Sequence, residues 1–167
     1  TGALFLAAAA AVALGGLGVV LRAVEARHGR LSLAGHRGLY DEAPALAVGF
    51  LVTGLGAVGF PGTLGFVAAE LLVDGALDAD PLVGVGLAVA AGLNGIAVVR
   101  AYLALFTGAT HASPVPLGVT ARERAAVLVL AALILGGGLV PQPGVTAARA
   151  AAEVVPQWRG VAASAGE

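Results

Sequence analysis

Four long apolar stretches make up most of this chain, and they constrain its fold more than any other feature of the sequence. A helix needs about 20 apolar residues to cross the hydrocarbon core of a bilayer. The second stretch contains a single charged residue, Glu70, and the third contains a single one, Arg100. We therefore predict an all-α fold, a polytopic integral membrane helix bundle with about four transmembrane helices. These helices are expected near residues 4–21, 44–73, 81–106 and 124–140.

The composition supports a membrane environment and excludes several functions. Hydrophobic residues make up 59% of the chain and charged residues only 11%, whereas a soluble domain carries about 25% charged residues. A net charge of −1 gives no basic surface for nucleic acid. The absence of Cys excludes a disulfide, a thiolate metal site and a cysteine nucleophile. We expect no cofactor and no metal site in this chain.

The polar segments between the stretches predict a topology. Four Arg lie in residues 22–43, none lies in 74–80, and two lie in 107–124. Because positive residues concentrate on the cytoplasmic side, the first and third of these loops are expected to be cytoplasmic. We divide the chain into one transmembrane helical unit over residues 1–145 and a polar, Ala-rich C-terminal tail over 146–167.

The second apolar stretch is too long for a straight span. Thirty residues of helix over 44–73 would reach about 45 Å, well beyond the roughly 30 Å hydrocarbon core. Pro61 lacks a backbone N–H and disturbs the preceding turn, and Gly59 and Gly62 flank it. We therefore predict that this helix is broken over Gly59–Thr63.

Two readings of the break follow from the residues. Non-helical backbone survives at membrane depth where it is buried in protein or lines a watery cavity, so the break could build an ion path or could only kink the helix for packing. Thr53 and Thr63 are expected to bond backbone groups that the break frees. Glu70, two turns later, is a candidate proton-transfer carboxylate. The other reading places Glu70 at the outer interface beside Asp74, simply hydrated.

Two further polar residues lie in the third stretch. Asn94 could bond a neighbouring helix, the commoner role of polar side chains in membranes, or could line a polar path. Arg100 lies near the expected cytoplasmic end, where its long side chain would reach the interface, with a place in a polar path as the alternative.

The residues around the break also resemble a known family. The segment Phe60–Val67, with its proline, glycine and threonine, resembles the broken-helix motif of the antiporter-like membrane subunits of NADH:quinone oxidoreductase (complex I chains M, N and L) and of the Mrp antiporters. The similarity covers roughly residues 10–145. Its other features are Gly38-Leu39-Tyr40 before Pro44, Arg100-Ala101-Tyr102-Leu103 with Phe106 and Gly108, the capping box Thr120-Ala121-Arg122-Glu123, and Gly138 to Pro143.

The resemblance implies a function and one discrepancy. It implies the C-terminal part of a proton-translocating subunit that contributes to a transmembrane proton channel, while redox chemistry takes place in other subunits. The expected partners are other membrane subunits, the lipid bilayer and protons or Na⁺. The alternatives are a subunit of a cation/proton antiporter, of a membrane-bound hydrogenase or of an inorganic-carbon uptake complex, or a structural subunit that carries no ions. Spacing from Pro61 places the acidic residue of the chain-M-like subunits on Ala69, one residue before Glu70.

The basic residues indicate a source. All nine are Arg, which is typical of a GC-rich bacterial genome, so we expect a multi-pass protein of the bacterial inner membrane.

Overall fold

The chain is all-helical in the part that the structure describes. The computed structural model describes residues 2–31, 33, 35–108 and 120–152, and no strand occurs among them. The predicted all-α class is confirmed. The helices are α1 (Gly2–His28), α2 (Pro44–Val58), α3 (Leu64–Ala79), α4 (Pro81–Phe106) and α5 (Ala121–Leu139), followed by a short helix over Gln142–Ala152.

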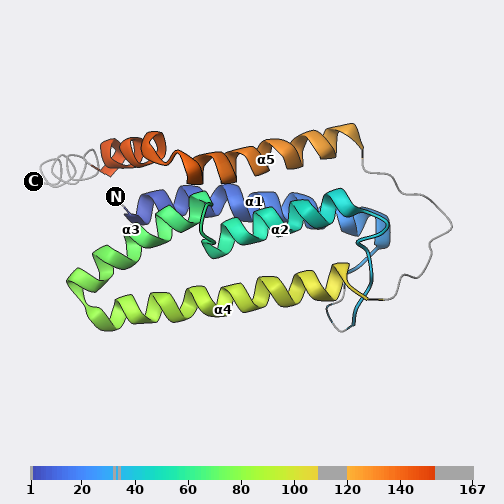
Figure 1. Ribbon diagram of the computed structural model, residues 1–167, viewed down its shortest axis with the longest axis horizontal. Helices are drawn as coiled ribbons and strands as arrows, with labels where there is room; N and C mark the ends of the chain where they lie inside the picture. Colours follow the sequence, from blue (N-terminus) through green and yellow to red (C-terminus); the bar gives the residue numbers. More distant parts are fainter. Residues whose placement is uncertain (1, 32, 34, 109–119, 153–167) are drawn as a thin grey trace, which may run out of the picture.

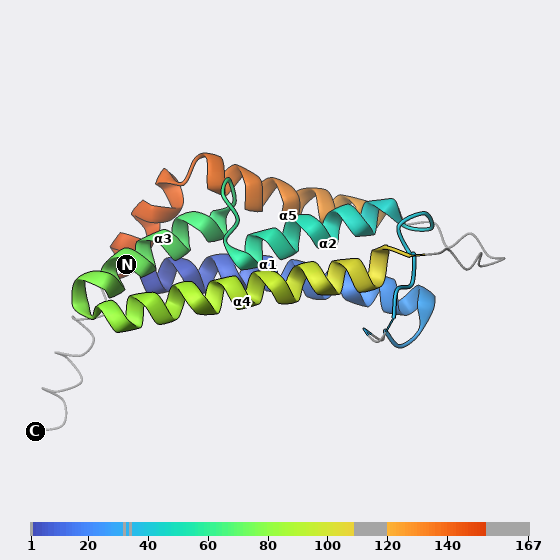
Figure 2. The ribbon, with the colours of Figure 1, turned by 60° about the horizontal axis from the view of Figure 1, so that its bottom comes forward.

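The helices form an antiparallel bundle with the broken pair at its centre. Helices α1, α2 and α3 lie together, with α4 on one side of them and α5 on the other (Figures 1 and 2). The end of α1, the start of α2, the end of α4 and the start of α5 meet at one end of the bundle (Figure 1), which we call the loop end. The corner between α3 and α4 lies at the other end.

Length and composition identify the spans. Helices α1 and α4 are long and apolar enough to cross a membrane, and a third span is added if α5 and the helix Gln142–Ala152, bent by 82°, count as one. Helix α2 is apolar but has only 15 residues. The exposed side chains of α4 include Leu82, Leu93 and Ile96, as expected for a helix that faces lipid. The chain is thus a helical membrane protein, in which the predicted second span is two half-length helices.

Two helices extend further than the apolar pattern predicted. Helix α1 continues beyond residue 21 to His28, where the basic side chains of Arg27 and His28 occupy its last turn. Cations are favourable at a helix C-terminus, so the polar segment prolongs the helix instead of ending it. Gly29 then leaves the helix with a φ of 70°.

Helix α3 likewise extends through most of the predicted loop 74–80. It ends at Ala79, and Asp80 alone separates it from α4. The carboxylate of Asp80 accepts a hydrogen bond from the N–H of Leu82 at 2.9 Å, and Pro81 occupies the first turn of α4. An Asp cap followed by proline is a favoured helix start, which explains how so short a corner can reverse the chain.

At the loop end, the chain before α2 caps the end of α4. The backbone N–H groups of residues 37, 38, 39 and 40 donate to the carbonyls of residues 104, 107, 105 and 106, at 3.0 to 3.3 Å. The last carbonyls of a helix have no partner within it, so these bonds satisfy groups that would otherwise need water. Phe50, Tyr102 and Phe106 pack beside them with ring centroids 5.3 to 6.2 Å apart.

An ion pair joins α1 to α5 at the same end. The predicted capping box is confirmed: the hydroxyl of Thr120 accepts from the N–H of Glu123, and the Glu123 carboxylate accepts from the N–H of Thr120. That carboxylate also accepts two bonds from the guanidinium of Arg27, one of them at 2.9 Å. The side chains are 9% and 25% exposed for Arg27 and Glu123 respectively. The last four residues of the predicted loop 107–124 belong to α5. Residues 109–119 of that loop lie outside the described part of the chain.

The chain after α5 does not leave the bundle at once. The helix Gln142–Ala152 crosses the predicted border between residues 145 and 146, and its Ala148 packs in a buried cluster with Phe5, Ala9 and Ala68. Residues 153–167 of the predicted tail lie outside the described part of the chain.

Candidate functional site

The second apolar stretch is interrupted over Gly59–Thr63. Gly59 ends α2 in the left-handed conformation, with φ 78° and ψ 45°. The N–H groups of Gly59 and Phe60 both donate to the carbonyl of Leu55. Gly62 also has a positive φ, 88°, so the two glycines that flank the proline supply the backbone freedom that the turn requires.

One of the two threonines acts at the break. The hydroxyl of Thr63 donates to the carbonyl of Phe60 at 2.7 Å, as expected, and its side chain is buried. The expected role of Thr53 at the break is wrong. Its hydroxyl donates to the carbonyl of Gly49 at 2.7 Å, one turn earlier in α2. A threonine inside a helix commonly bonds the carbonyl four residues back, and Thr53 follows that rule.

Glycine contacts hold the two half-helices and α5 together at the break. A Cβ on Gly65 would lie 2.0 Å from the carbonyl oxygen of Gly56, so α3 starts directly against the end of α2. A Cβ on Gly138 of α5 would lie 2.4 Å from the carbonyl oxygen of Gly62. Small residues permit such close backbone contacts between membrane helices.

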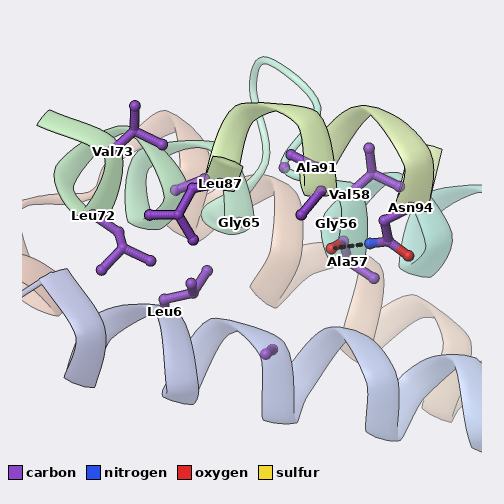
Figure 3. Close-up of a pocket in the computed structure, with 14 residues that line it drawn as sticks. Leu6, Gly56, Ala57, Val58, Gly65, Leu72, Val73, Leu87, Ala91 and Asn94 are labelled. Carbon is purple, nitrogen blue, oxygen red and sulfur yellow. Dashed lines mark hydrogen bonds between the residues drawn. The ribbon is translucent and has the colours of Figure 1, made fainter. Parts of the chain in front are cut away.

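A cavity of about 240 Å³ lies beside the break. Figure 3 shows its wall, which consists mainly of apolar side chains from α1, α3 and α4 together with residues of the last turn of α2. The residues that line it are Leu6, Ala10, Gly56, Ala57, Val58, Gly59, Gly65, Ala69, Leu72, Val73, Leu87, Ala90, Ala91 and Asn94.

Glu70 lies outside this cavity. Ala69 lines it, whereas Glu70 is exposed on α3, because one residue along a helix is a rotation of about 100°. Asp74 and Asp78 follow at intervals of four residues and are exposed as well, so the three carboxylates share one face of α3. The position at which the resemblance places an acid is Ala69, which lines the cavity. The role of Glu70 in proton transfer stays a prediction.

Asn94 bonds the broken helix directly. Its side-chain amide donates to the carbonyl of Ala57 at 3.2 Å (Figure 3). Ala57 is in the last turn of α2, where carbonyls have no partner within the helix. Asn94 thus bonds a neighbouring helix, which was one predicted role, and it also lines the cavity, where the predicted polar path could run.

Arg100 lies about two turns away from Asn94 toward the loop end. It is exposed and lines a surface hollow together with His36, Leu33 and several α4 residues. The hollow is separate from the cavity at the break, so the structure does not bring Arg100 together with Asn94 at one site.

Several features of the structure were not predicted from the sequence. The ion pair of Arg27 with Glu123 joins a residue placed in a loop to the capping box of another helix, and nothing in either local pattern indicates the other. A bond from Asn94 to a neighbouring helix was one of the two predicted roles, but the sequence did not identify Ala57 as the partner. The glycine that follows Asn94 permits the close helix approach. A Cβ on Gly95 would lie 3.3 Å from a methyl carbon of Val58.

Comparison with known proteins finds a matching family and two relatives of this chain. Residues 2–94 match the family described as NADH:quinone oxidoreductase/Mrp antiporter, TM. The chain is 34% identical over 131 residues to NADH-quinone oxidoreductase subunit M of Pseudomonas aeruginosa, a match that covers 76% of this chain and 25% of that protein. It is 40% identical over 80 residues to NADH-quinone oxidoreductase subunit 13 of Thermus thermophilus, covering 48% of this chain and 17% of that protein.

The matches therefore span a quarter or less of these relatives. The family match covers more than half of this chain and includes α1, the whole broken pair α2–α3 and α4 as far as Asn94. This chain belongs to the NADH:quinone oxidoreductase/Mrp antiporter transmembrane family.

Proposed function

We propose that this chain is part of a proton-translocating, antiporter-like membrane subunit of a complex I-type NADH:quinone oxidoreductase, and that it supplies part of a transmembrane proton path. The carrying observation is that the family match runs through the broken helix and ends at Asn94, on the wall of the cavity beside the break. Its partners would be other membrane subunits and the lipid bilayer, and its location the bacterial inner membrane.

The physical support lies in the half-helices. If the second stretch spans the membrane, their ends place carbonyl groups inside it, and such groups persist where protein or water satisfies them. Broken helices build ion sites in transporters because their ends carry partial charges inside the bilayer. In this proposal, the cavity between α1, α3 and α4 is the water-accessible part of the path. Glu70 exchanges protons on the exposed face of α3 with the parts of the assembly that lie against it.

A second candidate is a subunit of a cation/proton antiporter. The specific observation in its favour is the family itself, whose description joins the oxidoreductase with the Mrp antiporter. The two relatives are both named as NADH-quinone oxidoreductase subunits, which is why we place the oxidoreductase first.

The proposed function is tested by a substitution that fills the cavity with a larger apolar side chain. Ala69→Leu, made in the full subunit within its assembled complex, would put three more carbon atoms into the space beside Gly59. We expect protons translocated per NADH oxidised to fall by more than about half, since a path interrupted by apolar atoms loses its water. The measurement is acidification of inverted membrane vesicles with NADH oxidation followed in parallel.

Ala88→Leu is the matched control, because Ala88 is exposed on α4 and should leave the ratio unchanged. Glu70→Gln is the second arm and should lower the ratio with subunit content preserved. If Ala69→Leu and Glu70→Gln both pump like the parent, this segment carries no protons. Exchange of Na⁺ for protons in the absence of NADH would favour the antiporter instead.

A further inference from the structure

The cavity at the break has one polar side chain in its wall. Among the lining residues in the described part of the chain, all are Gly, Ala, Val or Leu except Asn94. The other polar atoms there are backbone groups of the last turn of α2. A cavity holds water where polar partners reach it, and cavities lined only by apolar groups tend to stay dry. The hydration of this cavity therefore depends on Asn94 and on the carbonyls beside it.

The backbone of α4 is close enough to α2 to make the contact of Asn94 specific. Gly95 faces Val58, and Val98 faces Gly54, where a Cβ would lie 2.6 Å from a methyl carbon of Val98. These close approaches lie beside the bond from the Asn94 amide to the carbonyl of Ala57 and on its loop-end side. The cavity lies on the other side of Asn94, at the level where α2 ends.

The hydrogen bonds at the break leave part of the Asn94 amide available for water. The carbonyl of Leu55 already accepts from two N–H groups, and the carbonyl of Ala57 accepts from Asn94. An asparagine amide has a second N–H and a carbonyl oxygen with two lone pairs. Asn94 is exposed at the rim of the cavity, so these remaining groups can bond water.

We propose that Asn94 is a positioning residue, which holds the C-terminal end of α2 against α4 and keeps the cavity at the break open to water. This inference rests on the proposed function for its meaning in proton transfer. It concerns a bond and a hydration state, however, that can be measured without any pumping.

The experiment measures water access at the cavity wall. This chain has no Cys, so Ala69→Cys places a single thiol of this segment in the cavity. The full subunit is labelled in native membranes with N-ethylmaleimide, which reacts with the hydrated, ionised thiol, and the parent, which keeps Ala69, gives the background. Within the Ala69→Cys background, the labelling rate is compared between Asn94, Asn94→Leu and Asn94→Gln.

We expect Asn94→Leu to slow the labelling about fivefold, the size of effect that loss of one ordinary hydrogen bond produces. Asn94→Gln keeps the donor and should restore the rate to nearly that of the chain with Asn94, which a role in packing alone would not predict. Leu93→Ala is the control, since Leu93 is exposed on α4, and it should leave the rate unchanged.

Equal labelling rates with Asn94, Asn94→Leu and Asn94→Gln would overturn the inference. If Asn94→Leu fails to reach the membrane, Asn94→Ala removes the donor with no added bulk, and the same slowing is expected. Labelling that responds to Asn94 while Ala69→Leu leaves pumping intact would reject the proposed function and keep the positioning role. The opposite pair of results would reject the positioning role alone.

Discussion

The carbonyl groups at the C-terminal ends of α4 and α2 obtain their hydrogen-bond partners in different ways. At the end of α4, four consecutive backbone N–H groups from residues 37–40 cover the carbonyls of residues 104–107. At the end of α2, the carbonyl of Ala57 accepts from one side-chain amide, that of Asn94, and the neighbouring carbonyl of Gly56 lies against Gly65.

The two helix ends differ in whether a substitution can remove their hydrogen-bond partners. The end of α4 is closed by backbone, which cannot be removed by a side-chain substitution. The end of α2 is held by glycine contacts and by one exchangeable side chain, next to a cavity. An end that is closed by backbone resists opening, whereas an end beside a cavity can bond water. The break is therefore the place in this bundle where single substitutions should have local effects on hydration.

The largest expected effect is at the glycine contact of the break. Gly65→Ala would place a Cβ 2.0 Å from the backbone oxygen of Gly56, and backbone on both sides cannot move away cheaply. We expect a loss of about 3 kcal/mol of stability, the upper part of the range for overpacking. The measurement is the thermal midpoint of the purified subunit in detergent.

Gly75→Ala provides the control for this substitution. Gly75 lies in the same helix, and a Cβ there would have nothing within 4 Å. It should be neutral or slightly stabilising, because alanine favours helix. Equal midpoints for Gly65→Ala and the parent would show that α2 and α3 are not in close backbone contact at Gly56 and Gly65.

A smaller effect is expected at the ion pair of the loop end. Arg27→Met removes the guanidinium that donates to Glu123 and leaves that carboxylate partly buried with its capping bonds alone. We expect a loss of about 2 kcal/mol, typical of hydrogen bonds to charged groups. The same thermal assay in detergent measures this loss. Limited proteolysis provides a second measurement, because cleavage at the loop end should become faster.

Arg22→Met is the matched control for the ion pair. Arg22 and Glu25 are 3.6 Å apart, and the Arg22 side chain is 85% exposed. Exposed pairs contribute roughly 0 to 1 kcal/mol, so this variant should stay close to the parent. If Arg22→Met destabilises as much as Arg27→Met, burial does not distinguish the two pairs.

Local chemistry made several parts of the fold predictable. Pro61 with two flanking glycines located the break, and Thr120 with Glu123 located the start of α5, because both patterns act within a few residues of backbone. The ends of α1 and α3 were predicted too early. An apolar stretch marks where a helix is buried in lipid, and it says nothing about polar turns such as those that hold Arg27 or Asp78.

The candidate site was less predictable than the fold. The one-residue difference between Ala69 and Glu70 decides which of them faces the cavity, and the packing of α3 against its neighbouring helices fixes that rotation. The partner of Asn94 is a backbone carbonyl 37 residues away. Because every residue has a backbone carbonyl, the identity of Ala57 does not predict this contact. Sequence alone therefore located the break, while the cavity and its polar atoms required the tertiary structure.

The smallest expected effect is at the end of α4, where backbone groups close the helix. Gly38 has a φ of 65°, and its N–H donates to the carbonyl of Thr107. Gly38→Ala should cost about 1 kcal/mol, because a Cβ is unfavourable in the left-handed region. Hydrogen exchange of the amides of residues 37–40 should become faster, with Gly35→Ala as the control. Labelling of the Ala69→Cys thiol at the break should not change, since the two helix ends are satisfied by separate groups. A change in that labelling rate would mean that closing the end of α4 also sets the opening at the end of α2, and the two ends would then form one coupled unit.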